Sequence, residues 1–274
     1  MLLSCGDALI DFLPVKSVDG RDAAVPVAGG SCLNVAVGIA RLGAAAGFVG
    51  GISTDLFGRM IADHALASQV DLRYAVRSGH QTTLAFVRTV AGEPQYAFYD
   101  EATASRNWIY RRESIAFDQI EAIHLGSTTL VNDEGAAQAR ALIDDADVSV
   151  TISFDPNCRP ALVRHKARYV DQMDAFAAAA NIVRMSDADF EFLYGGNDYA
   201  GRAKSLIEAG ASLEEICGIL FWKIKDMLLR KNFSKFSERE LKDMAARVSY
   251  LLPQARKRGM DAESALEQFL LEAF

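Results

Sequence analysis

The feature that most constrains the fold is a repeated alternation of short apolar runs with helical segments, separated by glycine turns. Short, continuous apolar runs are typical of strands that are buried on both faces. Their alternation with helices predicts a mostly parallel sheet covered by helices on both faces. The predicted strands are Leu2–Cys5, Gly47–Ile52, Ala122–Leu125, Val148–Phe154 and Asn181–Met185, and the predicted helices are 33–42, 55–69, 133–146, 166–180, 187–195 and 198–209.

Two segments interrupt this alternation. Residues Thr82–Val90 and Gln95–Tyr99 alternate apolar with polar side chains, and the turn-forming stretch Ala91–Pro94 joins them. Such a pattern predicts a β-hairpin. A hairpin inserted in a parallel α/β domain suits a lid over a site at the sheet edge, here at about residues 82–100.

The character of the chain changes at Ser212. Lysine-rich amphipathic segments follow, without any strand pattern, and Ser212 and Ser237 each begin a capping box of the form Ser-x-x-Glu. Asp261 can cap a third helix. We therefore expect an α/β domain over 1–212, followed by an all-α segment over 213–274.

Composition narrows the function classes. Half of the 274 residues are hydrophobic, which suffices for a large core, and the net charge of -7 argues against nucleic acid as a partner. Four scattered cysteines show no metal-ligand spacing, which suits a reducing cytoplasm without structural zinc. The uncharged stretch Ala23–Ala40 contains Pro26 and a glycine pair, so we expect a buried loop and helix there and no membrane partner.

Carboxylates follow the first predicted strand. Asp7 and Asp11 come directly after Leu2–Cys5, where open α/β sheets bind ligands in the crevice beyond the strand ends. A short acid at this place can hold two hydroxyl groups of a polyol. The alternative is that both are ordinary turn residues.

A glycine pair precedes the first predicted helix. Gly29 and Gly30 let the backbone approach a ligand closely, and Asn34, one turn into the helix, can both donate to and accept from a polyol. The stretch is not a phosphate-binding loop of the G-x-x-x-x-G-K-[ST] type. A plain turn before a core helix is the alternative.

Two later strand ends also carry polar side chains. Asn157 and Arg159 leave the fourth predicted strand, where arginine can make forked contacts to phosphate oxygens. Asp189, in the first turn of the helix after the fifth strand, can hold water on a magnesium ion. Ser186 and Asp189 equally form a capping arrangement.

The order and spacing of these motifs resemble the ribokinase/fructokinase (phosphofructokinase-B-type) family of carbohydrate kinases, and most closely its fructokinase and 2-keto-3-deoxygluconate kinase branch. The resemblance covers residues 1–212. It implies a ribokinase-like three-layer α/β sandwich with a small β lid, and phosphoryl transfer from ATP, with Mg2+, to a sugar hydroxyl. The motifs are G-D-A-L-I-D-F, A-G-G-S-C-L-N-V-A, G-G-I-S-T-D-L-F-G, the L-A-F-V and Y-A-F-Y hairpin strands, F-D-P-N-C-R-P and I-V-R-M-S-D-A-D.

Carried over motif by motif, the resemblance implies a set of site residues. The sugar site would be formed by Asp11, Gly29, Gly30, Asn34, Tyr96, Phe98 and Arg159, with Tyr96 and Phe98 closing the lid. Asn157 and Asp189 would be associated with phosphate and magnesium, although the family usually has glutamate where Asp189 stands. Asp100 stands where related keto-acid kinases place an arginine, which favours a neutral sugar such as fructose.

The family's catalytic base lies in a G-A-G-D segment, and no such segment occurs between Leu213 and Phe274. We therefore expect an incomplete sandwich with no catalytic residue, doubtful ATP binding and impaired activity. Residues 213–274 resemble instead the C-terminal helical domain of the DNA polymerase III delta subunit, an association module; a generic helical bundle is the alternative. The chain would then form a homo-oligomer or bind a protein partner through this segment. Two further hypotheses are a non-catalytic sugar- or partner-binding protein and a chimeric join.

Overall fold

The computed structural model describes residues 1–90, 93–196 and 239. The chain divides into two compact units, Met1–Phe176 and Ala177–Phe274, and each is described by itself. The predicted boundary at residue 212 and the predicted helix 198–209 lie outside the described residues. So does the predicted all-α segment 213–274, except for Arg239, which is exposed and helical.

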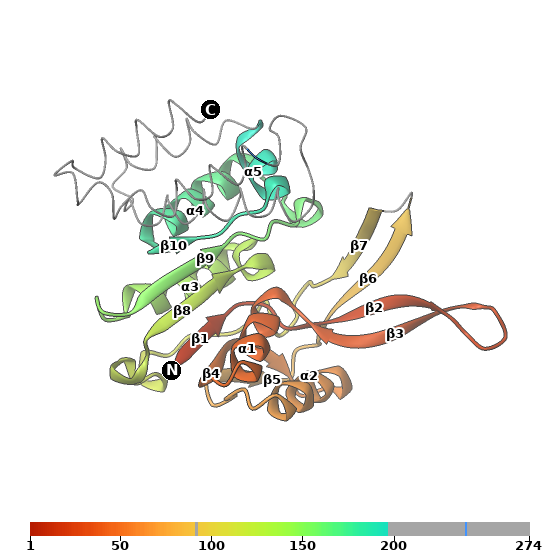
Figure 1. The fold of residues 1–274 in the computed structure, drawn as a ribbon, viewed down its shortest axis with the longest axis horizontal. Helices are drawn as coiled ribbons and strands as arrows, with labels where there is room; N and C mark the ends of the chain where they lie inside the picture. Colours follow the sequence, from red (N-terminus) through yellow and green to blue (C-terminus); the bar gives the residue numbers. More distant parts are fainter. Residues whose placement is uncertain (91–92, 197–238, 240–274) are drawn as a thin grey trace. The chain divides into compact units, whose positions relative to one another are not determined.

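A parallel sheet forms the centre of the first unit, in the order β9-β8-β1-β4-β5 (Figure 1). β1 lies in the middle, where Leu2 is in register with Ala46 on one side and Ala122 on the other. Because the strands are parallel, their carboxyl ends share one edge of the sheet. The bounds are β1 Leu2–Cys5, β4 Ala46–Ser53, β5 Ala75–Ser78, β8 Ala122–Gly126 and β9 Thr151–Asp155.

The helices of this unit agree with the predicted ones within a few residues. They are α1 Ser31–Arg41, α2 Leu56–Ala67, α3 Asp133–Asp144 and α4 Lys166–Ala179, the last of which continues into the second unit. Short 3-10 turns lie at Arg112–Ser114, Phe117–Gln119, Ser127–Leu130 and Pro160–Leu162. α1 packs on β1, β4 and β8, and α2 packs on β4.

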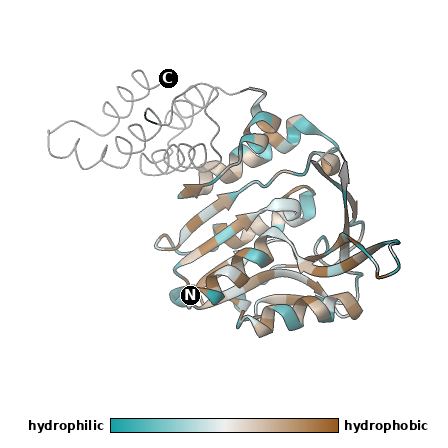
Figure 2. Ribbon diagram, turned by 45° about the vertical axis from the view of Figure 1, so that its right-hand side comes forward, coloured by the Kyte–Doolittle hydropathy of each residue, from teal (hydrophilic) through white to brown (hydrophobic). Residues whose placement is uncertain are grey.

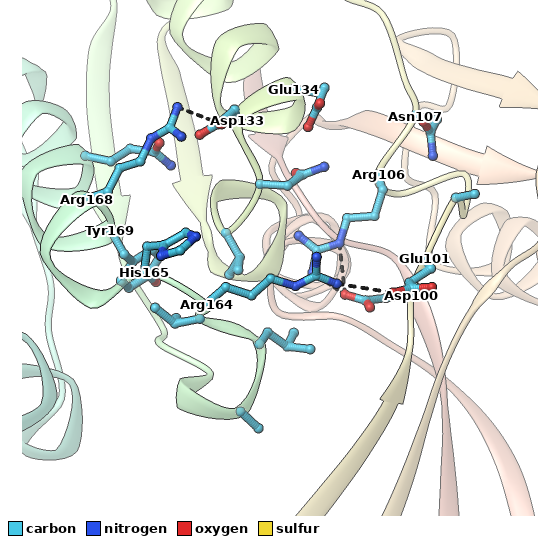
Figure 3. Close-up of a pocket in the computed structure, with 17 residues that line it drawn as sticks. Asp100, Glu101, Arg106, Asn107, Asp133, Glu134, Arg164, His165, Arg168 and Tyr169 are labelled. Atoms are coloured by element: carbon cyan, nitrogen blue, oxygen red, sulfur yellow. Dashed lines mark hydrogen bonds and ion pairs between the residues drawn. The ribbon is translucent and has the colours of Figure 1, made fainter.

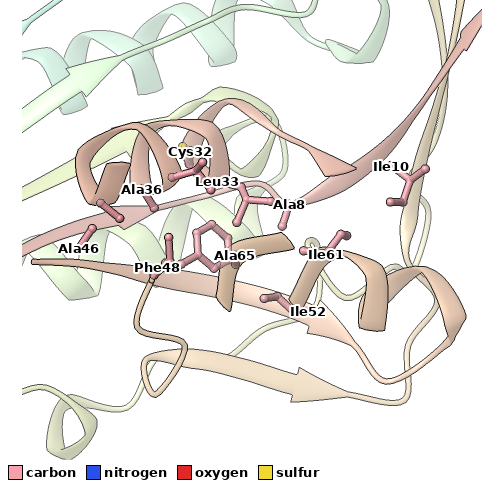
Figure 4. Close-up of a cluster of buried hydrophobic side chains, with 13 residues drawn as sticks. Ala8, Ile10, Cys32, Leu33, Ala36, Ala46, Phe48, Ile52, Ile61 and Ala65 are labelled. Atoms are coloured by element: carbon pink, nitrogen blue, oxygen red, sulfur yellow. The ribbon is translucent and has the colours of Figure 1, made fainter. Parts of the chain in front are cut away.

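Successive side chains of a strand point to opposite faces of the sheet, so alternate residues of β4 face α1 and α2 and form the core there. Ala46, Phe48 and Ile52, at even positions of β4, enter one buried cluster with Leu33 of α1 and Ile61 of α2 (Figure 4). All five residues are at most 2% exposed. In the view coloured by hydropathy, the helices carry hydrophobic and hydrophilic residues in turn, as expected for amphipathic elements on a sheet (Figure 2).

A second, four-stranded sheet has the order β3-β2-β6-β7. β6 and β7 are the predicted hairpin, while β2 and β3 form a ribbon that projects from the domain (Figure 1). β2 pairs with β6 in parallel, and both other pairings are antiparallel. We call this sheet the lid. Its strands are β2 Leu9–Lys16, β3 Asp22–Gly29, β6 Thr83–Val90 and β7 Glu93–Tyr99.

The prediction of a buried loop between Ala23 and the glycine pair was wrong. Residues Asp22–Val25 are exposed and belong to the edge strand β3. The ribbon was not predicted from the sequence, because β2 and β3 contain alanines and two prolines, which have low strand propensity. Pro26 is tolerated because β3 is an edge strand, and Pro14 lies beyond the part of β2 that pairs with β6.

In the second unit the described residues form β10, Ile182–Val183, and α5, Asp187–Tyr194. α5 begins at a capping box and ends at Gly195, whose φ of 69° is left-handed. Among the residues described in either unit, no helix has the length and apolarity required to cross a bilayer.

Candidate active site at the carboxyl edge of the sheet

Asp7, directly after β1, is buried at the carboxyl edge and only 2% exposed. Its Oδ1 accepts from the backbone N–H of Cys32 at 3.1 Å, and its Oδ2 accepts from the hydroxyl of Ser127 at 2.9 Å. Its backbone carbonyl accepts from the N–H of Leu33 at 3.2 Å. Asp7 therefore joins β1, α1 and the turn after β8. The alternative that Asp7 is an ordinary turn residue does not account for these contacts to two other segments.

Gly30 is the N-cap of α1, with a left-handed φ of 106°. A Cβ at this position would lie 2.5 Å from the carbonyl oxygen of Asp7, so a larger residue does not fit. The backbone N–H of Asn34 donates to the Gly30 carbonyl at 2.9 Å, and the Asn34 side chain is exposed one turn into the helix. The glycine turn thus leaves the amide of Asn34 accessible at the sheet edge.

Asp11 lies on β2, beside Gly29 on β3. A Cβ on Gly29 would lie 2.3 Å from Asp11 Oδ2, so the glycine makes room for the carboxylate. Burial raises the pKa of Asp11, and the charge of Asp7 raises it further, while Arg159 lowers it. Asp11 is therefore a half-buried acid with one anionic and one cationic neighbour.

The lid places aromatic side chains on the same face as Asp11. Asp11 is in register with Ala85, and Ala85 is in register with Phe98. Tyr96 stacks with Phe98, with ring centroids 5.7 Å apart, and the Arg159 guanidinium lies 5.8 Å from the centre of the Tyr96 ring. Asp11, Tyr96, Phe98 and Arg159 are thus brought together.

Asn157 holds this arginine. It has a left-handed φ of 40°, and its side-chain oxygen accepts from Arg159 Nη1 at 2.6 Å. The same Nη1 donates to the Cys158 carbonyl at 3.0 Å. Asn157 therefore positions Arg159, and its amide oxygen already has a partner within the loop.

Asp189 belongs to the second unit. Its Oδ2 accepts from the backbone N–H of Ser186 at 3.1 Å and from the Ser186 hydroxyl at 2.5 Å, while Ser186 caps the N–H of Asp189. The capping interpretation is confirmed, and the association with magnesium stays a prediction. Among the described residues of both units, no three His, Cys, Asp or Glu side chains are grouped as ligands for a metal ion.

A polar cavity of about 640 Å³ opens at the same carboxyl edge of the first unit (Figure 3). Three segments line it, each of which follows a strand: 100–107 after β7, 131–134 after β8, and 161–172 after β9. None of the predicted sugar-site residues is in its wall. This cavity was not predicted from the sequence, because its three lining segments are distant in the chain and none forms a motif.

Ion pairs form the wall of this cavity. Arg106, which is 8% exposed, pairs with Asp100 and donates through Nη1 to the Thr128 carbonyl at 2.5 Å. Two exposed pairs, Arg168–Asp133 at 2.7 Å and Arg164–Glu101 at 3.2 Å, complete the wall. The charge of Asp100 is thus compensated by Arg106, so the structure does not support the prediction of a neutral sugar from Asp100.

Both connections of the β6–β7 hairpin are anchored to the domain. Thr82 donates through its backbone N–H and its hydroxyl to Asp55, the N-cap of α2, at 2.8 and 2.6 Å. On the returning chain, the hydroxyl of Ser105 donates to the Ala8 carbonyl at 2.7 Å. Neither Ser105 nor Ser127 was predicted to make contacts at this edge. Ser127 lies two residues after the predicted strand Ala122–Leu125, and this position after a strand end could have indicated it.

Known proteins resemble this chain in sequence. The family profile of the pfkB family carbohydrate kinases matches residues 1–218. A fructokinase of Rhizobium leguminosarum bv. trifolii is 35% identical over 213 residues, which are 78% of this chain and 65% of that protein. The chain thus spans just under two thirds of the length of this curated relative.

Solved structures share the fold. An ATP-bound fructokinase from Xylella fastidiosa has a TM-score of 0.68 at 28% identity, over 77% of this chain and 66% of that one. A fructokinase double mutant from Vibrio cholerae with fructose, ADP and potassium has a TM-score of 0.67 at 25% identity, over 77% and 67%. The chain adopts the ribokinase-like fold of these fructokinases and belongs to the pfkB family of carbohydrate kinases.

Proposed function

We propose that this chain binds a neutral hexose such as fructose at Asp11, within a fructokinase-type phosphotransferase domain. The reaction of such a domain is transfer of the γ-phosphoryl group of ATP to a primary sugar hydroxyl. The observation that carries the proposal is the convergence of Asp11, Arg159, Tyr96 and Phe98 between the lid and the carboxyl edge of the sheet.

Each of these side chains has a suitable chemical role. The carboxylate of Asp11 accepts hydrogen bonds from two sugar hydroxyls, and the exposed amide of Asn34 donates and accepts. Tyr96 and Phe98 cover the apolar face of the ring. Gly29 and Gly30 keep side chains out of the space that the sugar needs.

The charge balance favours a neutral sugar. In the described part of the edge, Arg106 is paired with Asp100, and Arg159 is the remaining cation near Asp11. We assign Arg159 to the sugar and the transferring phosphate, because a guanidinium can contact both. A substrate carboxylate would be repelled by Asp11, and Arg159 is the one cation that acts on this acid in the described part of the edge. The names of the Rhizobium and Vibrio relatives agree with fructose.

ATP is the phosphoryl donor that we propose, because pfkB kinases use it and an ATP-bound fructokinase shares the fold. When bound, ATP supplies the phosphoryl group, and Arg159 is suited to its negative charge. Asn157 contributes by holding Arg159. The Asp189 carboxylate is engaged in its capping box, so we assign it at most a water-mediated contact to Mg2+.

We further propose that residues 1–274 alone transfer phosphate slowly. Residues 213–274 contain no G-A-G-D segment, which in this family supplies the base and the backbone N–H groups for the transferring phosphoryl group. Each such donor contributes a rate factor of about 10²–10³. We keep the division into a kinase domain over 1–212 and a helical association segment over 213–274 as part of this proposal.

Calorimetric titration of the purified chain with fructose tests the site. We expect Asp11→Asn to weaken binding about tenfold or more, since a half-buried charge that accepts from the sugar hydroxyls is lost. Asp63→Asn, an exposed position on α2, is the matched control and should bind as the wild type does. Equal affinity of both variants would refute the site.

Release of ADP in the presence of Mg-ATP and fructose tests the proposed impairment. Binding of fructose without turnover is the expected result. Turnover at about 1–100 s⁻¹, which is usual for kinases, would show that the chain is a complete catalyst.

A further inference from the structure

We infer that Asp7 is a positioning residue that builds the sugar site from beneath without contacting the sugar: its buried carboxylate fixes the start of α1 and the turn after β8 to the end of β1. The inference rests on the proposed function for its consequence in sugar binding. Its structural part depends only on contacts within the first unit.

The start of α1 needs a partner that its own sequence does not supply. The first backbone N–H groups of a helix have no acceptor within the helix, and a Ser, Thr, Asp or Asn at the N-cap normally provides one. Here the N-cap is Gly30, which has no side chain. Asp7 replaces it from another element, because its carboxylate accepts from Cys32 N–H and its carbonyl accepts from Leu33 N–H.

The location of this contact also suits a negative charge. The N-terminus of a helix carries a partial positive charge, so a carboxylate beside it is stabilised. Because Asp7 is buried after β1 and accepts from two N–H groups of the first turn of α1, it ties that turn to the end of β1. The Gly29–Gly30 pair and Asn34 are held with it.

The other carboxylate oxygen reaches the turn after β8. Asp7 Oδ2 accepts from Ser127, whose φ of 65° is left-handed, and is 3.4 Å from the hydroxyl of Thr128. The Cys32 thiol adds a weak contact, donating to the Gly126 carbonyl at 3.6 Å. One buried carboxylate thus connects three segments that are distant in sequence.

The charge of Asp7 also acts on the sugar-binding acid. Asp11 is influenced by Asp7, which raises its pKa, and by Arg159, which lowers it; burial is the largest cause of the net rise. The Cys32 thiol, beside Asp7, is a further titratable group. Burial raises the pKa of Cys32 first, the charge of Asp7 raises it next, and Cys5 and Asp155 add smaller contributions in the same direction.

Two variants of Asp7 separate the effect of its hydrogen bonds from the effect of its negative charge. Asp7→Ala removes both oxygens, and we expect fructose affinity to fall about tenfold or more, since misplacement of site groups by an ångström has effects of this size. Asp7→Asn keeps an acceptor for Cys32 N–H and places a donor toward Ser127. It should restore most of the affinity at neutral pH.

The pH dependence provides a readout that loss of structure alone would not produce. Removing the negative charge in Asp7→Asn should lower the pKa of Asp11. The loss of fructose binding on acidification should therefore begin at a lower pH than in the wild type. Ser127→Ala, which keeps the charge of Asp7, should leave the pKa of Asp11 at its wild-type value.

Carboxyl NMR titration of Asp11 in the sugar-free chain measures this pKa, and circular dichroism verifies the fold of each variant. An unchanged Asp11 pKa in Asp7→Asn, or wild-type affinity in a folded Asp7→Ala, would overturn the inference. If the wild type itself bound no fructose, the proposed function would fail. The NMR titration would still decide whether Asp7 acts on Asp11.

Discussion

At the scale of single residues, the carboxyl edge is constrained by close backbone approach. Gly51 on β4 is buried, and a Cβ there would lie 1.8 Å from the Ala104 carbonyl oxygen. Gly38, in contrast, lies within α1 with open space around its Cβ position. The two glycines therefore differ in whether a methyl group can be added.

We predict that Gly51→Ala lowers the free energy of unfolding by about 1–3 kcal/mol, because overpacking against backbone must displace the segment at Ala104. The matched variant Gly38→Ala should raise it by about 0.5–1 kcal/mol, because alanine favours the helix. Urea unfolding measures both. If Gly51→Ala had the wild-type free energy of unfolding, the segment at Ala104 would move without loss of stability, and the prediction would be wrong.

The pKa of Asp11 provides a second prediction. Arg159→Gln removes the cation that lowers this pKa, so the pKa should rise and sugar binding should be lost at a higher pH on acidification. Arg159→Lys keeps the charge and should change the pKa less. Carboxyl NMR of Asp11 compares the variants, and a fall of the pKa in Arg159→Gln would contradict the assigned geometry.

The sequence predicted Asp11 and Arg159 because their motifs follow strand ends, and Gly29 and Gly30 because a glycine pair precedes a helix. Local pattern alone did not separate Asp7 from Asp11; only the family resemblance singled out Asp11, and we propose different roles for the two. Both follow the same strand, and only the pairing of β2 with β3 and β6 moves Asp11 onto the lid. The burial of Asp7 depends on Cys32 and Ser127, which are distant in the chain.

At the scale of elements, Asp55 connects a helix to the lid. Its Oδ1 accepts from Gly58 N–H, which caps α2, and both of its oxygens accept from Thr82 at the start of the hairpin. Asn132 is a simpler N-cap, which accepts from Gly135 N–H at the start of α3. Comparing the loss of these two N-caps therefore separates the contribution of the Asp55–Thr82 contact from that of helix capping.

We predict that Asp55→Ala costs more stability than Asn132→Ala, by about 1–3 kcal/mol, since it also leaves the buried N–H of Thr82 without an acceptor. Each cap by itself contributes about 0.5–2 kcal/mol. Urea unfolding at neutral pH makes the comparison. Equal losses would show that the contact to Thr82 contributes nothing.

The effect of Asp55 should also depend on pH. Burial raises its pKa, but hydrogen bonds from Thr82 and Gly58 together bring the net pKa below the usual value. A lowered pKa in the folded state stabilises the protein above the unfolded pKa of about 3.9, and this contribution is lost as pH falls. The stability difference between wild type and Asp55→Ala should therefore shrink in acid.

Strong periodicity made most elements predictable. The buried strands β1, β4 and β8 and the helices α1 to α5 were placed within a few residues. The ribbon β2–β3 and the short β5 were not predicted. β5 is placed by its pairing with β4, and the ribbon by its pairing with β6 and by the packing of Phe12 on Phe86 and Phe57, none of which local pattern records.

At the scale of the whole molecule, the proposed impairment can be tested by replacement. We predict that exchanging residues 213–274 for the corresponding C-terminal part of the Rhizobium relative raises fructose-dependent ADP release by about 10²-fold or more. The same chimera with Asp11→Asn is the control and should lose this gain. A chimera no faster than the natural chain would contradict the proposal.

The strand order β9-β8-β1-β4-β5 has a consequence for synthesis on the ribosome. β1 is made first and lies in the middle; β4 and β5 then extend the sheet on one side, and β8 and β9 extend it on the other. When each later strand of this sheet leaves the ribosome, the strand with which it pairs has already been synthesised. This order suits folding from the N-terminus during translation. The lid strands are also complete by Tyr99, and among the described residues the turn at Ser127 and Thr128 supplies the last partners of the Asp7 carboxylate to be made.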